Sequence, residues 1–176
     1  MTPPDIEAIR ETEQEYTDEV IEDNTIPEMF EDAVERYPDN DAQMYKGGIY
    51  SRSLTPEIID EPEPGEYTSL SYEEMRGLVR RLAAGFRELG VETEDRVGIM
   101  SNPRMEWALS DFGLLAAGGT VTTVYTESSP KQIKYLLNDP GATGVVVENE
   151  YLLDRIVKVQ DELSLEFVVV IDELEK

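Results

Sequence analysis

Four short apolar segments, separated by stretches with helical periodicity, constrain the fold of this chain most. They cover residues 96–100, 120–125, 143–147 and 166–171, and they are rich in valine, isoleucine and threonine. Between them, apolar residues recur at the three- and four-residue spacing of amphipathic helices. Strands that alternate with helices form right-handed crossovers, and these produce a mainly parallel sheet covered by helices. The sequence therefore predicts an α/β fold with a doubly wound sheet flanked by helices.

Helix start and stop signals divide the rest of the chain. Capping boxes, in which a serine or threonine precedes glutamate or glutamine by three residues, predict helix starts at Thr25, Ser71 and Ser129. Gly90 ends the clearest helical stripe. A further helix is expected to open at Asn102.

Three other segments are expected to differ from this pattern. Residues 43–45 and 67–70 predict a small extended or hairpin unit, and a helix is expected over 149–163. Residues 1–24 are nearly all polar, so they are expected to form an acidic arm, either mobile or helical against a partner surface.

The chain is strongly acidic. Its 176 residues include 39 acidic and 15 basic side chains, for a formal charge of −24, and residues 1–66 hold 20 of the acids but 4 of the bases. This charge excludes a nucleic-acid binder that works by neutralising phosphates, and it disfavours docking on anionic lipid. The acidity is expected to reflect a solvated arm and surface, or an adaptation to concentrated salt, which screens repulsion between like charges.

Two absent residue types exclude whole classes of chemistry. The sequence has no cysteine and no histidine. Disulfide frameworks, thiolate metal sites, zinc chemistry and Ser-His-Asp catalysis are therefore excluded, and no metal site is expected. The N-terminus lacks a signal-peptide pattern, and no apolar stretch approaches the length of a membrane span. A soluble protein with a cytoplasmic location and no transmembrane segment is expected.

The expected strands end at Ser101-Asn102, Tyr125-Thr126, Glu148-Asn149 and Asp172, at the edge where open α/β sheets bind ligands. The crevice candidates are Asn102, Tyr125 and Thr126 at these ends, and Trp107 in the helix that follows, as a residue that lines a hydrophobic pocket. Each also has a structural interpretation: Asn102 or Ser101 as a helix cap, Trp107 as packing between helix and sheet, and the Tyr125–Thr126 pair as part of the framework. Neither a dinucleotide-binding glycine motif nor a P-loop occurs at these turns, so no phosphate cradle is predicted.

Several segments follow one another in a specific order. They are Tyr72-Glu-Glu-Met75, Asp95-Arg-Val-Gly-Ile99, Ser101-Asn-Pro-Arg-Met-Glu-Trp107, Ala116-Ala-Gly-Gly119, Val124-Tyr-Thr126 and Ser129-Pro-Lys-Gln-Ile-Lys-Tyr-Leu-Leu137. This order resembles the N-terminal region of the AMP-forming acyl-CoA synthetases. The segment ending in Trp107 and the Tyr125–Thr126 pair are most similar to the long-chain fatty acid branch.

The resemblance implies an enzyme that uses ATP, Mg²⁺ and coenzyme A to convert a fatty acid to acyl-CoA, AMP and pyrophosphate. The family's phosphate loop, ribose-binding acid and C-terminal lysine match no position here, so no catalytic residue is assigned and no cofactor is expected on this chain. Residues 25–176 are then the first part of the large domain, inactive alone, with the rest of the enzyme as their partner.

Two other functions stay open at this point. The chain could be a stand-alone doubly wound domain that binds a nucleotide or another small molecule, or a non-catalytic interaction module that uses its acidic arm. An uncovered sheet edge at 167–171 also predicts self-association.

Overall fold

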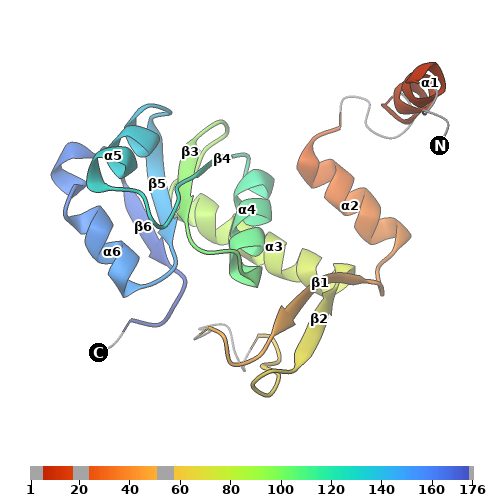
Figure 1. Cartoon of the computed structure of the whole chain (residues 1–176), viewed down its shortest axis with the longest axis horizontal. Coiled ribbons are helices and arrows are strands. Elements are labelled where there is room, and N and C mark those ends of the chain that lie inside the picture. Colours follow the sequence, from red (N-terminus) through yellow and green to blue (C-terminus); the bar gives the residue numbers. More distant parts are fainter. Residues whose placement is uncertain (1–5, 18–23, 51–57, 175–176) are drawn as a thin grey trace.

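The chain forms six helices and six strands in the residues that a computed structural model describes, which are 6–17, 24–50 and 58–174. The helices are α1 (Ile6–Tyr16), α2 (Ile26–Arg36), α3 (Tyr72–Glu88), α4 (Met105–Ala116), α5 (Pro130–Asn138) and α6 (Glu150–Val157). The strands are β1 (Asp41–Lys46), β2 (Tyr67–Ser71), β3 (Arg96–Met100), β4 (Thr120–Thr123), β5 (Ala142–Val147) and β6 (Phe167–Val170). Figure 1 shows the β3–β6 sheet on one side, the β1–β2 ribbon and α2 on the other, and α3 and α4 between them.

The larger sheet is parallel throughout and has the strand order β4-β3-β5-β6. Alternate side chains of its strands point into two separate cores, as the pleat requires. Val97 and Ile99 pack with α3 and α4, whereas Met100, Val145 and Val147 pack with α5 and α6. Helices therefore cover both faces, and the predicted doubly wound α/β fold is confirmed.

The β1–β2 ribbon is antiparallel and belongs to a third core. Tyr45 and Leu70 from the ribbon pack against Phe30 of α2 and Leu109 of α4. The hydroxyl of Tyr45 also donates a 2.6 Å hydrogen bond to a backbone carbonyl in the long connection between the two strands. The predicted extended unit is thus confirmed, and α4 contributes to both the ribbon core and the sheet core.

The predicted helix starts at Thr25, Ser71 and Ser129 are confirmed. In each capping box the hydroxyl accepts from the backbone N–H three residues on, and the glutamate or glutamine there accepts from the cap in return. Gly90 takes a φ of 97°, which is the left-handed conformation that ends a helix at low cost.

Three expected boundaries were wrong. Helix α4 begins at Met105 rather than Asn102, because Arg104 is still extended and the polar groups of Asn102 bond elsewhere. Strand β4 ends at Thr123 rather than at residue 125. The helix expected over 149–163 ends at Val157 and is followed by a short 3₁₀ helix.

The acidic arm contains a helix. Helix α1 stands apart from the rest of the chain in Figure 1, and the residues within it whose burial is described are exposed. Residues 1–5 and 18–23 of the expected arm lie outside the described residues. None of the helices in the described ranges combines the length and apolarity that a bilayer crossing needs.

Candidate functional site

A buried carboxylate lies between the ends of the neighbouring strands β3 and β5. After these two strands the chain turns to opposite faces of the sheet, to α4 after β3 and to α6 after β5. Glu148 follows β5 directly and is 5% exposed. It accepts hydrogen bonds from the backbone N–H of Asn102 at 2.6 Å, from its side-chain amide at 3.0 Å, and from the hydroxyl of Ser101 at 3.2 Å. This switch point is where doubly wound proteins bind ligands. Here it is occupied by a side chain of the protein itself.

A second cluster ties the start of α4 to the end of β6. The Arg104 side chain is fully buried and donates to Glu106 and to Asp172, each at 2.8 Å. Burial disfavours the charged guanidinium, but the two carboxylates outweigh burial, so the pKa of Arg104 lies above its ordinary value. The ring of Tyr50 lies 4.3 Å from the guanidinium, and Tyr50 donates to the backbone carbonyl of Pro103 at 3.2 Å. Arg104 is therefore a fixed positive charge beneath the ring.

A third contact holds the loop that follows β4. Arg155 of α6 donates from one guanidinium nitrogen to the backbone carbonyl of Thr126 and from the other to that of Ser128. The N–H of Ser128 bonds to the carbonyl of Tyr125 at 2.9 Å and closes a turn between them. The loop is thus fixed by a neighbouring helix as well as by its own hydrogen bond.

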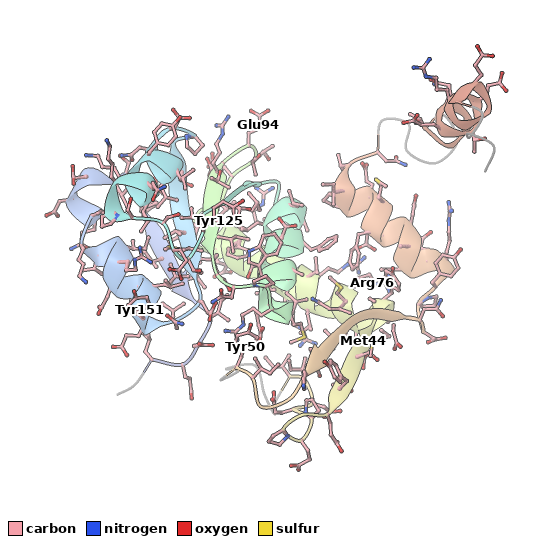
Figure 2. The ribbon with its side chains drawn as sticks, in the orientation of Figure 1. Met44, Tyr50, Arg76, Glu94, Tyr125 and Tyr151 are labelled. Atoms are coloured by element: carbon pink, nitrogen blue, oxygen red, sulfur yellow. The ribbon has the colours of Figure 1, made fainter. Side chains whose placement is uncertain are left out.

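These strand ends form one wall of a groove of about 740 Å³, and the β1–β2 ribbon forms the other. Figure 2 shows Tyr125 on the sheet side and Met44 on the ribbon side. The groove is mainly apolar and aromatic, and most of the residues that line it come from two stretches, 43–50 and 101–108. The remaining lining residues are Tyr67, Thr123, Val124, Tyr125 and Thr126.

All four crevice candidates line this groove. Tyr125 is 75% exposed at its rim, and Asn102 is exposed beside it. Trp107 is half-buried, and it also packs against the core between the sheet and α3, so its groove and packing roles coexist. Asn102 does not cap α4: the N-cap position belongs to Arg104, which makes no side-chain cap hydrogen bond, and the donors of Asn102 bond to Glu148.

Sequence reasoning missed the ribbon wall and the buried charges. Glu148 and Asp172 were placed at the ends of predicted strands, but their hydrogen bonds to Asn102 and Arg104 were not predicted. Arg104 and Arg155 carry no such signal, because Arg104 joins its near neighbour Glu106 to Asp172, 68 residues away, and the partners of Arg155 are 27 and 29 residues away.

ATP and Mg²⁺ do not fit the charged groups at this edge of the sheet. Two carboxylates, Glu148 and Asp172, lie at the strand ends, and the neighbouring arginines already bond to protein acceptors. A triphosphate would therefore meet negative charge at the two carboxylates, and the terminal nitrogen of Arg104 that has no hydrogen-bond partner is buried away from solvent. Within the described ranges, no group of three or more acidic side chains gathers at one point.

The strand order and the helices on both faces define an α/β domain of the doubly wound class, with a groove at its strand ends. The profile of a family described as "AMP-binding enzyme" matches residues 30–176. The chain therefore belongs to the AMP-binding enzyme family.

Curated relatives and solved structures agree with this family. The chain is 30% identical over 150 residues to long-chain-fatty-acid–CoA ligase ACSBG1 of Rattus norvegicus, a match that covers 85% of this chain and 19% of that protein. It is 36% identical over 86 residues to long-chain-fatty-acid–CoA ligase FadD15 of Mycobacterium tuberculosis, which covers 49% of this chain and 14% of that protein. The chain spans between about a seventh and a fifth of the length of these curated relatives.

A solved long-chain-fatty-acid-CoA ligase, FadD1 from Archaeoglobus fulgidus, has the same fold. The two superpose with a TM-score of 0.66 at 20% identity, over 80% of this chain and 26% of that one. At this identity the likeness concerns the fold alone.

Proposed function

We propose that this chain is the N-terminal portion of an AMP-forming long-chain fatty acid–CoA ligase. Such an enzyme converts a fatty acid, ATP and coenzyme A to acyl-CoA, AMP and pyrophosphate. Support comes from the family and from relatives that carry this name. The apolar groove at the strand ends is the observation that carries the proposal, because it lies where the fold class binds ligands.

In this proposal the groove holds part of the aliphatic chain of the fatty acid. Its volume of about 740 Å³ is within the range of small-molecule sites, and its lining is mainly apolar. Each methylene buried there contributes about 0.8 kcal/mol. Lys46 and Arg104 are the cationic side chains of the lining, and Arg104 is already paired with two carboxylates. The groove therefore suits the apolar tail rather than the carboxylate.

The chain is expected to be inactive alone. ATP, Mg²⁺ and coenzyme A supply adenylation and thioester formation in the whole enzyme, while the groove residues bind the acyl chain and exclude water. Incubation of the chain with ATP, Mg²⁺, palmitate and coenzyme A is expected to release no AMP. Release of AMP above a protein-free blank would contradict this part of the proposal.

Trp107 provides a direct test of acyl binding, because it is the sole tryptophan in the chain and lines the groove. Titration with palmitate is expected to change its fluorescence saturably. Tyr125→Ala is expected to weaken the apparent affinity about fivefold through lost aromatic contact. Tyr135→Ala is the matched control, because Tyr135 is 63% exposed and lies on α5, outside the groove lining. A wild-type chain with no saturable response would overturn the proposal.

We also propose self-association of the isolated chain. Strand β6 forms one edge of the sheet, and its Val168 is 38% exposed. An edge strand with free backbone groups and apolar side chains pairs readily with a second chain. Sedimentation velocity between about 10 and 100 µM is expected to show dimers or larger species. A single monomeric boundary across that range would count against the idea.

The acidity supports a further proposal of adaptation to concentrated salt. With 39 acidic and 15 basic side chains, like-charge repulsion opposes folding at low ionic strength. The Debye length falls from about 10 Å at 0.1 M salt to about 3 Å at 1 M. The thermal midpoint is therefore expected to rise as KCl increases from about 0.1 to 3 M, and an unchanged midpoint would remove the proposal.

A further inference from the structure

Arg155 lies outside the groove lining, yet it contacts the wall of the groove. Its two terminal nitrogens bond to the carbonyls of Thr126 and Ser128, which belong to the loop between β4 and α5. Beyond the hydrogen bond from the N–H of Val124 to β3, this loop leaves the sheet ladder. The hydrogen bonds from Arg155 therefore hold the loop that carries Tyr125, where hydrogen bonds to a neighbouring strand no longer do.

The chemistry of the contact requires an arginine. A guanidinium presents two donors in a rigid plane and can bond to two carbonyls at once, whereas a lysine ammonium is a single point charge on a flexible stem. The ring of Tyr151, one turn earlier on α6, lies 5.9 Å from the guanidinium and helps to hold it. The Arg155 side chain is half-buried, so water competes weakly for these bonds.

The segment that carries Arg155 contacts both polar parts of the groove wall. At its start, Glu148 accepts from Asn102, which follows β3. One turn into α6, Arg155 donates to Thr126, which follows β4. Because Asn149 caps α6 through the N–H of Leu152, the distance between these two anchors is set by a rigid helix start.

We propose that Arg155 is a positioning residue that fixes the width of the groove through the backbone of the Tyr125–Ser128 loop. The proposal rests on the proposed function, because width matters only where the groove holds an acyl chain. A fixed wall favours a straight chain over a branched one, since branches need the wall to retreat. Arg155 then contributes to substrate selection without contacting the substrate.

The test compares two Arg155 variants with a control in the whole 176-residue chain. Arg155→Met removes both donors, and Arg155→Lys keeps the charge and one point of contact. Arg96→Met is the control, because Arg96 is exposed and begins β3 at the opposite end of the sheet. Circular dichroism and urea unfolding establish whether each variant folds. If Arg155→Met does not fold, the comparison is made between Arg155→Lys and the wild type.

Two readouts are expected to respond. Acrylamide is expected to quench Trp107 more strongly in Arg155→Met than in the wild type without any ligand, because the loop no longer restricts access. Palmitate affinity is expected to fall about tenfold in Arg155→Met and about threefold in Arg155→Lys. The ratio of palmitate to phytanate affinity is expected to fall as well, which a general loss of stability would not cause.

The outcomes separate the two proposals. Palmitate binding in the wild type together with unchanged quenching and an unchanged palmitate-to-phytanate ratio in both variants would overturn the role of Arg155 and leave the groove proposal intact. No palmitate response in the wild type would overturn the acyl-binding proposal. In that case acrylamide quenching of Trp107 alone decides whether Arg155 holds the loop. Equal quenching in the wild type and in Arg155→Met would overturn that role of Arg155.

Discussion

The two walls of the groove are built in different ways. The sheet wall is held by buried charged groups: Glu148 bonds to Asn102, and Arg104 bonds to Glu106 and Asp172. The ribbon wall is a two-stranded sheet whose groove-facing Met44 and Tyr67 are 65% and 64% exposed. One wall depends on partners distant in the chain, and the other presents side chains to solvent.

This difference means that the strand ends of the sheet wall are held in fixed positions, whereas the side chains of the ribbon wall can be exchanged. Buried hydrogen-bonded charges have few acceptable arrangements, because an unpaired charge is costly, so they fix the strand ends in place. Exposed side chains on a ribbon can change with little effect on folding. We infer that the sheet wall fixes the position of the groove, and that the side chains of the ribbon wall determine which ligands the groove binds.

The largest expected effect concerns Arg104. Arg104→Met removes the cation that bonds to both Glu106 and Asp172. Breaking a buried ion pair in this way costs about 3–5 kcal/mol. Urea unfolding should show this loss, while the exposed control Arg96→Met should stay within about 0.5 kcal/mol of the wild type. A loss below about 1 kcal/mol for Arg104→Met would mean that the sheet wall does not depend on this cluster.

The next effect concerns Glu148. Glu148→Ala leaves the donors of Asn102 and Ser101 without their acceptor, which costs about 1–3 kcal/mol in unfolding free energy. Glu148→Gln retains an acceptor oxygen and is expected to lose less. If the alanine and glutamine variants were equally destabilised, the negative charge rather than the hydrogen bonds would hold β3 and β5 together.

A smaller effect is expected on the ribbon wall. Met44→Gln changes an exposed side chain, so its unfolding free energy should stay within about 0.5 kcal/mol of the wild type. Its affinity for palmitate, read from Trp107 fluorescence, is expected to fall because Met44 lines the groove. A stability loss as large as that of Glu148→Ala would remove the contrast between the two walls.

The smallest effect concerns Asp111 on α4, the helix that contacts both regions. Burial raises the pKa of Asp111, so between its unfolded and folded pKa values the folded state binds more protons than the unfolded state. This contribution to stability is present below the unfolded pKa and is lost as pH rises through the folded pKa. Asp111→Asn is therefore expected to be slightly more stable than the wild type at pH 7.

The pH dependence provides the control for Asp111→Asn. Its advantage in thermal midpoint should shrink as pH falls to about 3, where the aspartate is protonated in both states. An advantage that is constant across this range would assign the effect to packing rather than to the charge of Asp111.

The fold was largely predictable because its signals are local. Capping boxes at Ser71 and Ser129 depend on residues three positions apart, and the strand segments alternate with amphipathic stripes along the chain. The errors occurred where a distant partner competes with the local signal. Asn102 has a side chain suited to a helix cap, but its donors bond to Glu148, 46 residues away, and α4 begins at Met105 after an extended Arg104.

The candidate site was predictable in part, for the same reason. Asn102, Tyr125 and Thr126 were identified because the carboxyl ends of parallel strands meet at one edge of the sheet, and Trp107 because an aromatic residue after such a strand can line a pocket. The ribbon wall of the groove was not predicted, because the position of the ribbon opposite the strand ends depends on how it packs against α2, α3 and α4.

By itself, the amino-acid sequence determined the order of helices and strands, the acidity of the chain, the absence of cysteine and histidine chemistry, and which residues lie at the carboxyl ends of the strands. These properties follow from composition and from interactions between near neighbours. Only the tertiary structure decided that Glu148 fills the switch point, that Arg104 is shared between Glu106 and Asp172, and that Arg155 holds the loop of Tyr125. Buried charges choose partners by their distance in space, and that distance exists only after the strands and helices have packed.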